Sequence, residues 1–234
     1  VLQEETPVPG NKVKRRYRME QVLPTYLVGI AISNYAEIKQ VHTGAFGDRD
    51  ILLLGSPSDS FNMANSFTYL GDCIDALEYW FGPYIWGQVG FVATNVGAME
   101  HSTLIAYPDF SAYGGPDFGQ NRLMAHELGH HWWGNMISPD HPSDMWFKEG
   151  HAEYSAHLFT EWTFGKEAFI DQVMDNHFSN ISELHVSEGY LALSGMTYEN
   201  TYSNHTYYRG ASMIHNLRAY LGDSLFRNYR TPTR

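Results

Sequence analysis

Residues 126–135 of this chain read HELGHHWWGN, and the first five of them form the pattern H-E-x-x-H. In an α-helix, residues four positions apart lie on nearly the same face, so the imidazoles of His126 and His130 can converge on one ion. Glu127 lies about 100° further round the helix and can hold a water bound to that ion. Imidazole nitrogen and carboxylate oxygen at an open tetrahedral site suit Zn²⁺, so we expect one zinc ion per chain.

A third zinc ligand must come from a separate element, because two imidazoles leave the site incomplete. Glu149, within the segment MWFKEG at 145–150, is the best candidate. A short turn and a second, antiparallel helix would bring it back over the first helix. The alternatives are a surface helix with two solvated histidines and a solvated glutamate, and spacing alone leaves them open. His131 points about 140° away from His126 and is expected to pack rather than bind metal.

Composition limits the class of protein. The 234 residues suit one large domain, or one domain plus part of another, with 43% apolar residues for a core. A formal charge of −11, from 15 basic and 26 acidic residues, argues against nucleic acid as a partner. The single cysteine, Cys73, excludes an intrachain disulfide and is expected to be buried.

Targeting signals are not readable from this chain. No apolar run approaches the roughly 18 residues of a membrane span, so we expect none here. The first residue is not Met and the ends look trimmed, which leaves periplasmic or secreted and cytoplasmic locations equally open. The oligomeric state is not indicated either.

Hydrophobic periodicity predicts a mixed α+β chain. Short apolar runs predict buried strands at 26–32, 51–54 and 89–94, the last continuing to 101. Helical spacing predicts helices at 63–81, 121–135, 143–164, 166–178 and 208–221. We expect Asn121 and Ser143 to cap two of these helices, and Gly165 to end one. Residues 107–121 read as a loop, and 178–207 as loops with room for one helical turn.

The motifs together resemble those of the zinc aminopeptidases of the alanyl aminopeptidase family. HELGHHWWGN and WFKEG carry the first likeness, with eighteen residues between His130 and Glu149. GAMEH at 97–101 is similar to the family's G-x-M-E-N, and YYRG at 207–210 to its Y-x-K-G. These enzymes are gluzincins, so the resemblance implies a thermolysin-like zincin domain with a small β-sheet and helices at 41–234. It also implies that 1–40 are the C-terminal strands of an N-terminal β domain, and that the C-terminal helical domain is absent.

The resemblance also implies a set of roles for individual residues. Glu127 would take the proton of the zinc-bound water and pass it to the leaving amine. Tyr207 would stabilise the oxyanion, with Tyr208 as the alternative. Glu100 would bind the free α-amine of a peptide substrate. The rest of this motif would contact the substrate backbone: Gly97, Ala98, Met99 and His101.

One further carboxylate and three departures from the family complete these expectations. Glu153, one turn after Glu149, is expected to hold the outer nitrogen of a ligand histidine, to bind the amine, or to be solvated. His101 stands where the family has Asn. Lys148 replaces an Asn and Arg209 a Lys, and we expect both to be peripheral to the metal.

The leading hypothesis is therefore a zinc-dependent aminopeptidase that hydrolyses the N-terminal peptide bond of peptides. A non-catalytic zinc- or peptide-binding homologue is the first alternative, because the departures leave room for it. An endopeptidase on the same scaffold is the second, and it would differ in accepting peptides with a blocked amino terminus.

Overall fold

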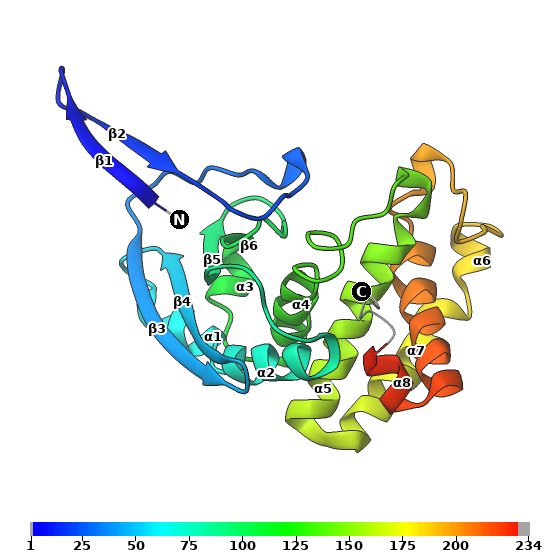
Figure 1. Ribbon diagram of the computed structural model, residues 1–234. Coiled ribbons are helices and arrows are strands. Elements are labelled where there is room, and N and C mark those ends of the chain that lie inside the picture. The colour runs from blue at the N-terminus through cyan, green and yellow to red at the C-terminus, as the bar shows by residue number, and fades with distance from the viewer. Residues whose placement is uncertain (1, 229–234) are drawn as a thin grey trace.

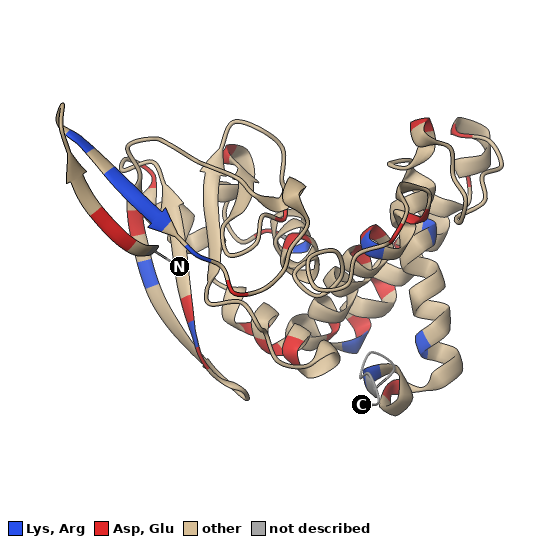
Figure 2. Ribbon diagram, turned by 45° about the horizontal axis from the view of Figure 1, so that its top comes forward, with Lys and Arg blue, Asp and Glu red and all other residues tan. Residues whose placement is uncertain are grey.

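The computed structural model describes residues 2–228, in which a sheet and a group of helices lie side by side (Figure 1). No helix in that range combines the length and the apolar character needed to cross a membrane. The chain begins with a hairpin of β1 (Leu2–Val8) and β2 (Lys12–Tyr17), whose strands pair antiparallel. Basic residues of β2 face acidic ones of β1, as in the 2.7 Å ion pair of Arg15 with Glu5 (Figure 2).

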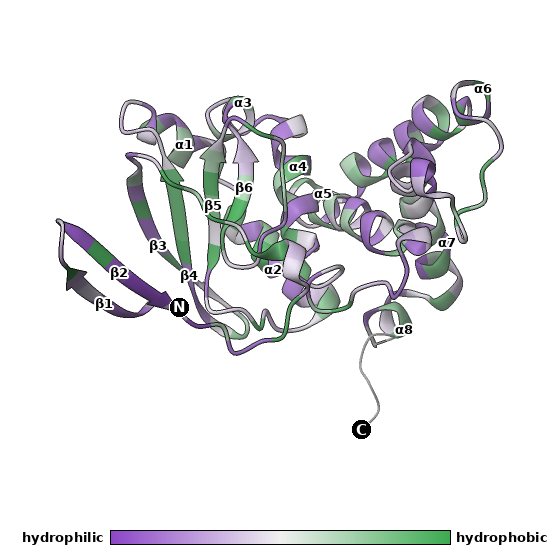
Figure 3. Ribbon diagram, turned by 90° about the horizontal axis from the view of Figure 1, so that it is seen from above, coloured by the Kyte–Doolittle hydropathy of each residue, from purple (hydrophilic) through white to green (hydrophobic). Residues whose placement is uncertain are grey.

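The main sheet has the strand order β3-β4-β5-β6. Its strands are β3 (Ala36–Gly44), β4 (Gly47–Gly55), β5 (Val89–Thr94) and β6 (Ile105–Pro108). β3 and β4 form an antiparallel hairpin, whereas β4, β5 and β6 run parallel. The parallel connection from β4 to β5 passes through α1 (Ser60–Ser66) and α2 (Leu70–Phe81). The inner strands of this sheet, β4 and β5, are strongly apolar, as expected for strands covered on both faces. The hairpin of β1 and β2 is largely hydrophilic by contrast (Figure 3).

The helical half is built on α4 (Phe118–Gly129) and α5 (Trp146–Asp175), which pack against one another. α5 bends at Gly165, whose φ of 91° no helix accommodates. α7 (Gly210–Leu221) and α8 (Asp223–Asn228) follow, and α4 lies between them and the sheet (Figure 1). One continuous apolar core joins the two halves, so α4 is held by both. Its members include Leu53, Phe91, Cys73, Leu128, Trp132 and Ile214.

Several predicted elements are confirmed. The strands at 51–54 and 89–94 lie within β4 and β5. Gly165 interrupts the long helix where expected, and the helix at 166–178 continues beyond it. Cys73 is buried in α2. The division of the chain at residue 40 stays a prediction.

The strand predicted at 26–32 is wrong. Only a 3₁₀ turn, η1 (Thr25–Leu27), forms there, and Leu27 is its one buried residue. Val28, Ile30 and Ile32 are exposed, Ile32 by 90%. An apolar run forms a strand only where a neighbouring strand can take its hydrogen bonds, and none lies beside this segment among residues 2–228. The extension of β5 to 101 is also wrong, since Met99 makes only an isolated bridge to Ala106.

Helix boundaries differ from the predictions where local capping decides them. The helix predicted at 63–81 is divided into α1 and α2. Asp117, rather than Asn121, caps α4, accepting a hydrogen bond from the Gln120 amide at 2.8 Å. α4 ends at Gly129, after which the amides of His131 and Trp132 bond three residues back, to the carbonyl oxygens of Leu128 and Gly129. A 3₁₀ turn, η2 (Pro142–Asp144), precedes α5, so Ser143 is not its cap.

The supposed loops contain short ordered pieces. β6 and α3 (Asp109–Ala112) lie within 107–121. The segment 178–207 holds part of a π-helical turn, η3 (Asn176–Ile181), then α6 (Leu184–Ser187) and a 3₁₀ turn, η4 (Tyr198–Asn200). A second π-helical turn, η5 (His205–Arg209), leads directly into α7. Single π-helical turns are common at functional sites.

Candidate metal centre and substrate pocket

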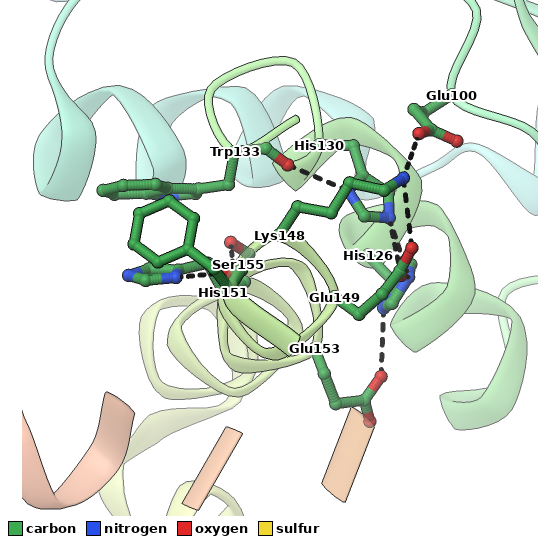
Figure 4. A network of polar contacts seen from close by, with 10 residues as sticks. Glu100, His126, His130, Trp133, Lys148, Glu149, His151, Glu153 and Ser155 are labelled. Atoms are coloured by element: carbon green, nitrogen blue, oxygen red, sulfur yellow. Dashed lines mark hydrogen bonds and ion pairs between the residues drawn. The ribbon is translucent and has the colours of Figure 1, made fainter. Parts of the chain in front are cut away.

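Three ligand atoms converge where α4 faces the start of α5 (Figure 4). The Nε2 atoms of His126 and His130 lie 3.1 Å apart. Glu149 Oε2 lies 3.4 Å from the first and 3.1 Å from the second. A tetrahedral ion with bonds of about 2.0–2.1 Å holds its ligand atoms about 3.3 Å apart, so the spacing fits zinc.

Hydrogen bonds at Nδ1 of the two imidazoles fix the orientation of each ring and therefore the direction of its Nε2 atom. His126 Nδ1 lies 3.0 Å from Glu153 Oε2, and His130 Nδ1 lies 2.9 Å from the Trp133 carbonyl oxygen. Both partners only accept hydrogen bonds, so each Nδ1 must carry the hydrogen and donate it. The two Nε2 lone pairs then face each other and the Glu149 carboxylate. Such a cluster of acceptors needs a cation, and this donor set is one that zinc prefers.

Charge around the cluster supports the same conclusion. Burial opposes ionisation of His126, but hydrogen bonds to Glu149 and Glu153 outweigh it and raise its pKa to about 10. With no ion bound, a proton at Nε2 thus supplies the positive charge that these carboxylates require, and a metal ligand would have to lose it. Burial also opposes the charge of Glu149, yet the neighbouring imidazoles of His130 and His126 hold its pKa well below the usual range. The carboxylate is therefore ionised, as a metal ligand must be.

Glu127 is the titratable group best placed to move a proton at neutral pH. It is buried and lines the same cavity as the cluster. Burial raises its pKa to about 7, a rise that the imidazoles of His126 and His130 only partly offset. A carboxyl group with such a pKa can both accept and release a proton near neutrality.

A cavity of about 500 Å³ opens beside the cluster. It brings together most of the predicted site residues, including Glu127, Glu153, Tyr207 and three residues of the GAMEH motif. Gly97 and His101 are not among the residues that line it. His101 instead places its Nδ1 3.1 Å from the Leu27 carbonyl oxygen. The lining residues are Ala98, Met99, Glu100, Gly119, Arg122, Leu123, His126, Glu127, His130, Lys148, Glu149, Glu153, Tyr202, Tyr207 and Tyr208.

Glu153 lies where the sequence predicted a supporting carboxylate. One of its oxygens accepts the hydrogen bond from His126, and the other pairs with Arg122. Burial works against its charge, but the hydrogen bond from His126 and the charges around it lower its pKa to about 2. Arg122 was missed in the sequence, although it lies four residues before His126 and so on the same face of α4.

The expectation that Lys148 is peripheral to the metal is wrong. Its ammonium pairs with Glu100 and lies 3.0 Å from Glu149 Oε1, as Figure 4 shows. Burial disfavours the charge of this lysine, but the carboxylates of Glu149 and Glu100 raise its pKa above the ordinary value. Glu100 has its pKa lowered to about 2, since the opposite charges of His130 and Lys148 overcome its burial. Arg209 does lie away from the cavity and donates to the Leu191 carbonyl oxygen.

Both candidate tyrosines reach the cavity from η5, and Tyr207 lies beside the ligand His126. Its ring centroid lies 6.0 Å from that of His126. Burial raises the pKa of Tyr207, so the phenol keeps its proton and can donate it in a hydrogen bond. η5 is held against α5 where Gly150 and Gly210 meet with no side chain between their backbones. Tyr202 also lines the cavity, although no motif in the sequence includes it.

His131, Trp132 and Trp133 of HELGHHWWGN pack in the core next to the metal ligands. His131 is fully buried, and its Nδ1 lies 2.8 Å from the Tyr84 hydroxyl, which confirms a packing role. Burial lowers the pKa of His131 to about 3, so this imidazole is neutral. Trp132 and Trp133 are buried in the core, and Trp133 stacks on His151 at 3.9 Å between centroids.

Solved structures with this fold are known. A variant of an M1 zinc metallopeptidase from Deinococcus radiodurans, bound to a Tyr-Ser-Ala substrate, superimposes with a TM-score of 0.81. The match covers 98% of this chain and 50% of that one at 20% identity, so the likeness shows the fold alone.

Sequence comparison finds aminopeptidases. Probable aminopeptidase 2 of Sulfurisphaera tokodaii is 24% identical over 240 residues, covering 96% of this chain and 30% of that protein. Leucyl aminopeptidase of Saccharolobus solfataricus is 26% identical over 236 residues, covering 93% and 29%. Aminopeptidase N of Oryctolagus cuniculus is 28% identical over 155 residues, covering 60% and 16%. The chain thus spans less than a third of the length of these relatives.

The profile of the peptidase family M1 domain matches residues 67–230, which include the three ligands, Glu100, Glu127 and both candidate tyrosines. The match covers well over half of the chain. With its His-His-Glu cluster, this chain belongs to the M1 family of zinc metallo-aminopeptidases.

Proposed function

We propose that this chain is the catalytic part of a zinc-dependent aminopeptidase, which hydrolyses the N-terminal peptide bond of peptides. The convergence of His126, His130 and Glu149 at 3.1–3.4 Å, with Glu127 beside them, carries the proposal. The three ligands would hold one Zn²⁺, which when bound activates a water and polarises the scissile carbonyl. The aminopeptidases among its relatives support the same activity.

Glu127 would move the proton. Its pKa of about 7 means that the ionised form is available to take a proton from the attacking water. The protonated form can then deliver that proton to the nitrogen of the departing peptide. The buried position of Glu127 keeps bulk water from competing for it.

Tyr207, Glu153 and Glu100 would complete the site. The Tyr207 phenol can donate a hydrogen bond to the oxygen on which negative charge develops. Glu153 would act through His126, keeping its Nε2 directed at the metal. Glu100 is the ionised group that supports a requirement for a free amino terminus, since α-amines are largely cationic near neutral pH.

The test compares hydrolysis of leucine p-nitroanilide by the zinc-loaded chain and by Glu127→Gln. We expect the variant to keep one zinc per chain and to lose at least about a thousandfold in kcat, since it cannot take a proton. Glu20→Gln is the matched control, because that glutamate is exposed and lies outside the cavity. Retained turnover in Glu127→Gln would refute the mechanism. Zinc binding without turnover by the parent chain would favour the non-catalytic alternative.

A further inference from the structure

Arg122 lies at the end of the cavity opposite to Glu100. Glu100 is on the side of His130, the imidazole whose charge acts most strongly on its carboxylate. Arg122 comes one turn before His126 in α4, and its guanidinium pairs with Glu153 on that side of the cluster. Figure 4 shows Glu100 and Glu153 on opposite sides of the metal ligands. A peptide whose amino terminus binds at Glu100 therefore extends past the metal towards Arg122.

The span between the metal and Arg122 suits a short peptide. An α-helix rises by about 1.5 Å per residue, so Arg122 lies about 9 Å further along α4 than the midpoint of His126 and His130. Glu153 bonds to both His126 Nδ1 and the guanidinium, which draws the guanidinium back towards the metal. An extended peptide advances by about 3.5 Å per residue. The guanidinium is thus placed for a carboxylate one or two residues beyond the scissile bond.

A bound ligand can reach the guanidinium, because the cavity is open at this end. Gly119 and Leu123 line it beside Arg122, whose side chain is 25% exposed. An added Cβ at Gly119 would meet only Asp117 Oδ1, at 3.5 Å, so the first turn of α4 leaves space in front of the arginine. The ion pair with Glu153 holds the guanidinium in place while its exposed part faces the cavity.

Charge at this end favours an anion only through Arg122. With zinc bound, the two positive charges of the ion are cancelled by the ligand Glu149 and by Glu153, and Glu127 adds a negative charge whenever it is ionised. Arg122 supplies the positive charge that offsets it on this side of the cluster. A guanidinium carries five N–H donors in a planar fork, so it can bind a second carboxylate beside the one that it already holds.

We infer that Arg122 is a specificity-determining residue, which binds the α-carboxylate of dipeptide and tripeptide substrates. The cavity then favours short peptides with a free carboxyl end over the same peptides ending in an amide. An amide has no charge to pair with the guanidinium, so it gains little from it. The inference rests on the proposed function, which places the amino terminus at Glu100 and the scissile bond at the metal.

The test compares leucyl-alanine with leucyl-alanine amide, which differ only at the carboxyl end. Zinc-loaded protein carrying Glu127→Gln is titrated with each by calorimetry, so that binding is measured without turnover. With Arg122 present, we expect the free acid to bind about tenfold or more tightly than the amide. Arg122→Gln should weaken binding of the free acid by about tenfold and change that of the amide by less than about threefold, because only the acid loses a charged partner.

Peptide length provides a second comparison. Leucyl-alanyl-alanine and its amide extend the peptide by one residue, and we expect the preference for the free acid at one or both of these two lengths. A leucine followed by four alanines carries its carboxylate about 14 Å beyond the scissile bond, at about 3.5 Å per residue, which is past the guanidinium. This pentapeptide and its amide should bind alike.

Three further variants make the result specific. Arg15→Gln breaks an exposed arginine–glutamate pair in β2, outside the cavity, and should change no affinity. Arg122→Lys keeps a positive charge beside Glu153 but not the fork, so it should reduce the preference for the free acid several-fold. It decides the matter if Arg122→Gln folds poorly or loses zinc. Glu153→Gln removes the charge already paired with the guanidinium, so the preference should be kept or increased.

Three results would overturn the inference. The first is binding of acid and amide within about threefold at both short lengths, or an equal preference in the pentapeptide, while Arg122 is present. The second is a preference that persists unchanged in folded, zinc-loaded Arg122→Gln and Arg122→Lys, as expected if the carboxylate binds the metal directly. The third is an equal loss of affinity for acid and amide, which would mean that Arg122 acts only through Glu153 and His126.

Failure of the proposed function has a different signature. A chain that hydrolyses no aminoacyl substrate still reports the binding affinities for acid and amide. Turnover of leucine p-nitroanilide by a parent chain that binds acid and amide alike would leave the function standing and remove the role of Arg122.

Discussion

A methyl group at Gly150 should separate Tyr207 from the metal cluster. Gly150 of α5 meets Gly210, the first residue of α7, and an added Cβ would lie 2.7 Å from the Gly210 carbonyl carbon and 2.8 Å from its Cα. Ordinary contacts of a Cβ begin at 3.4 Å, so the two backbones would have to part by about 0.7 Å, the difference between 3.4 and 2.7 Å. Backbone atoms cannot rotate away as a flexible side chain can. Tyr207 lies three residues before Gly210 and would move with it.

Two measurable losses follow from Gly150→Ala. Overpacking of this kind costs about 1–3 kcal/mol, which should appear as a lower free energy of unfolding in urea. Displacement of a catalytic group by 1 Å costs on the order of a hundredfold in rate, so a shift of about 0.7 Å should lower kcat on leucine p-nitroanilide by about 10–100-fold. Zinc content should stay at one per chain, because Gly150 carries no ligand and the three ligand atoms come from α4 and Glu149.

Gly119→Ala is the matched control for stability, because the same substitution in α4 meets no close contact. Its added Cβ would contact only Asp117 Oδ1, at an ordinary 3.5 Å. Alanine is a better helix former than glycine, so this variant should gain up to about 1 kcal/mol in stability. A loss of unfolding free energy in Gly150→Ala and a gain in Gly119→Ala would support the close approach of α5 and α7. A Gly150→Ala protein as stable and as active as its parent would refute the reasoning.

Other consequences of the site can be tested separately. Tyr207→Phe should lower kcat by about 10²–10³-fold and Tyr208→Phe by only a few-fold, since the Tyr207 ring lies beside His126 whereas Tyr208 interacts with the charges of Glu153 and Arg122; equal losses would contradict this assignment. Glu153→Gln should weaken zinc binding by about 10–100-fold in competition with a chelator, because the charge behind His126 is lost; an unchanged zinc affinity would leave Glu153 without a role. His157 is buried with no hydrogen-bond partner for either ring nitrogen among the described residues, and burial lowers its pKa from 6.5 to about 4. Between pH 6.5 and 4 only the unfolded chain gains this proton. The free energy of unfolding should therefore fall as the pH falls, by about 1.36 kcal/mol per pH unit and by up to about 3 kcal/mol in all. His157→Leu should make this fall smaller.

The metal ligands were the part of the site that local sequence could predict. Two histidines four residues apart share a helix face whatever surrounds that helix, because the period of the backbone alone places them there. The position of Glu149 needed one further step, a return of the chain to a second helix beside the first. That return takes the whole segment 130–145 and not the short turn expected, and α5 then packs against α4. The strands at 51–54 and 89–94 were likewise readable, because continuous apolar runs suit strands buried on both faces.

Other features depended on neighbours that are distant in the sequence. The apolar run at 26–32 has the composition of a strand, yet with no strand beside it in the described part of the chain it stays exposed. The caps of α4 and α5 fell at different residues from those predicted, because a cap is chosen by local geometry among several polar candidates.

Lys148 shows most clearly what only the tertiary structure decided. In the sequence it is a charged residue next to a ligand, and nothing in its spacing relates it to Glu100, 48 residues earlier. The fold brings the segment between β5 and β6 close to the start of α5, and Gly134 leaves room for the lysine stem. Helical periodicity determines which side chains share one face of an element, whereas packing between elements determines which charges meet. The sequence alone therefore identified how the chain can bind zinc, and the tertiary structure decided which charges lie beside the ligand Glu149.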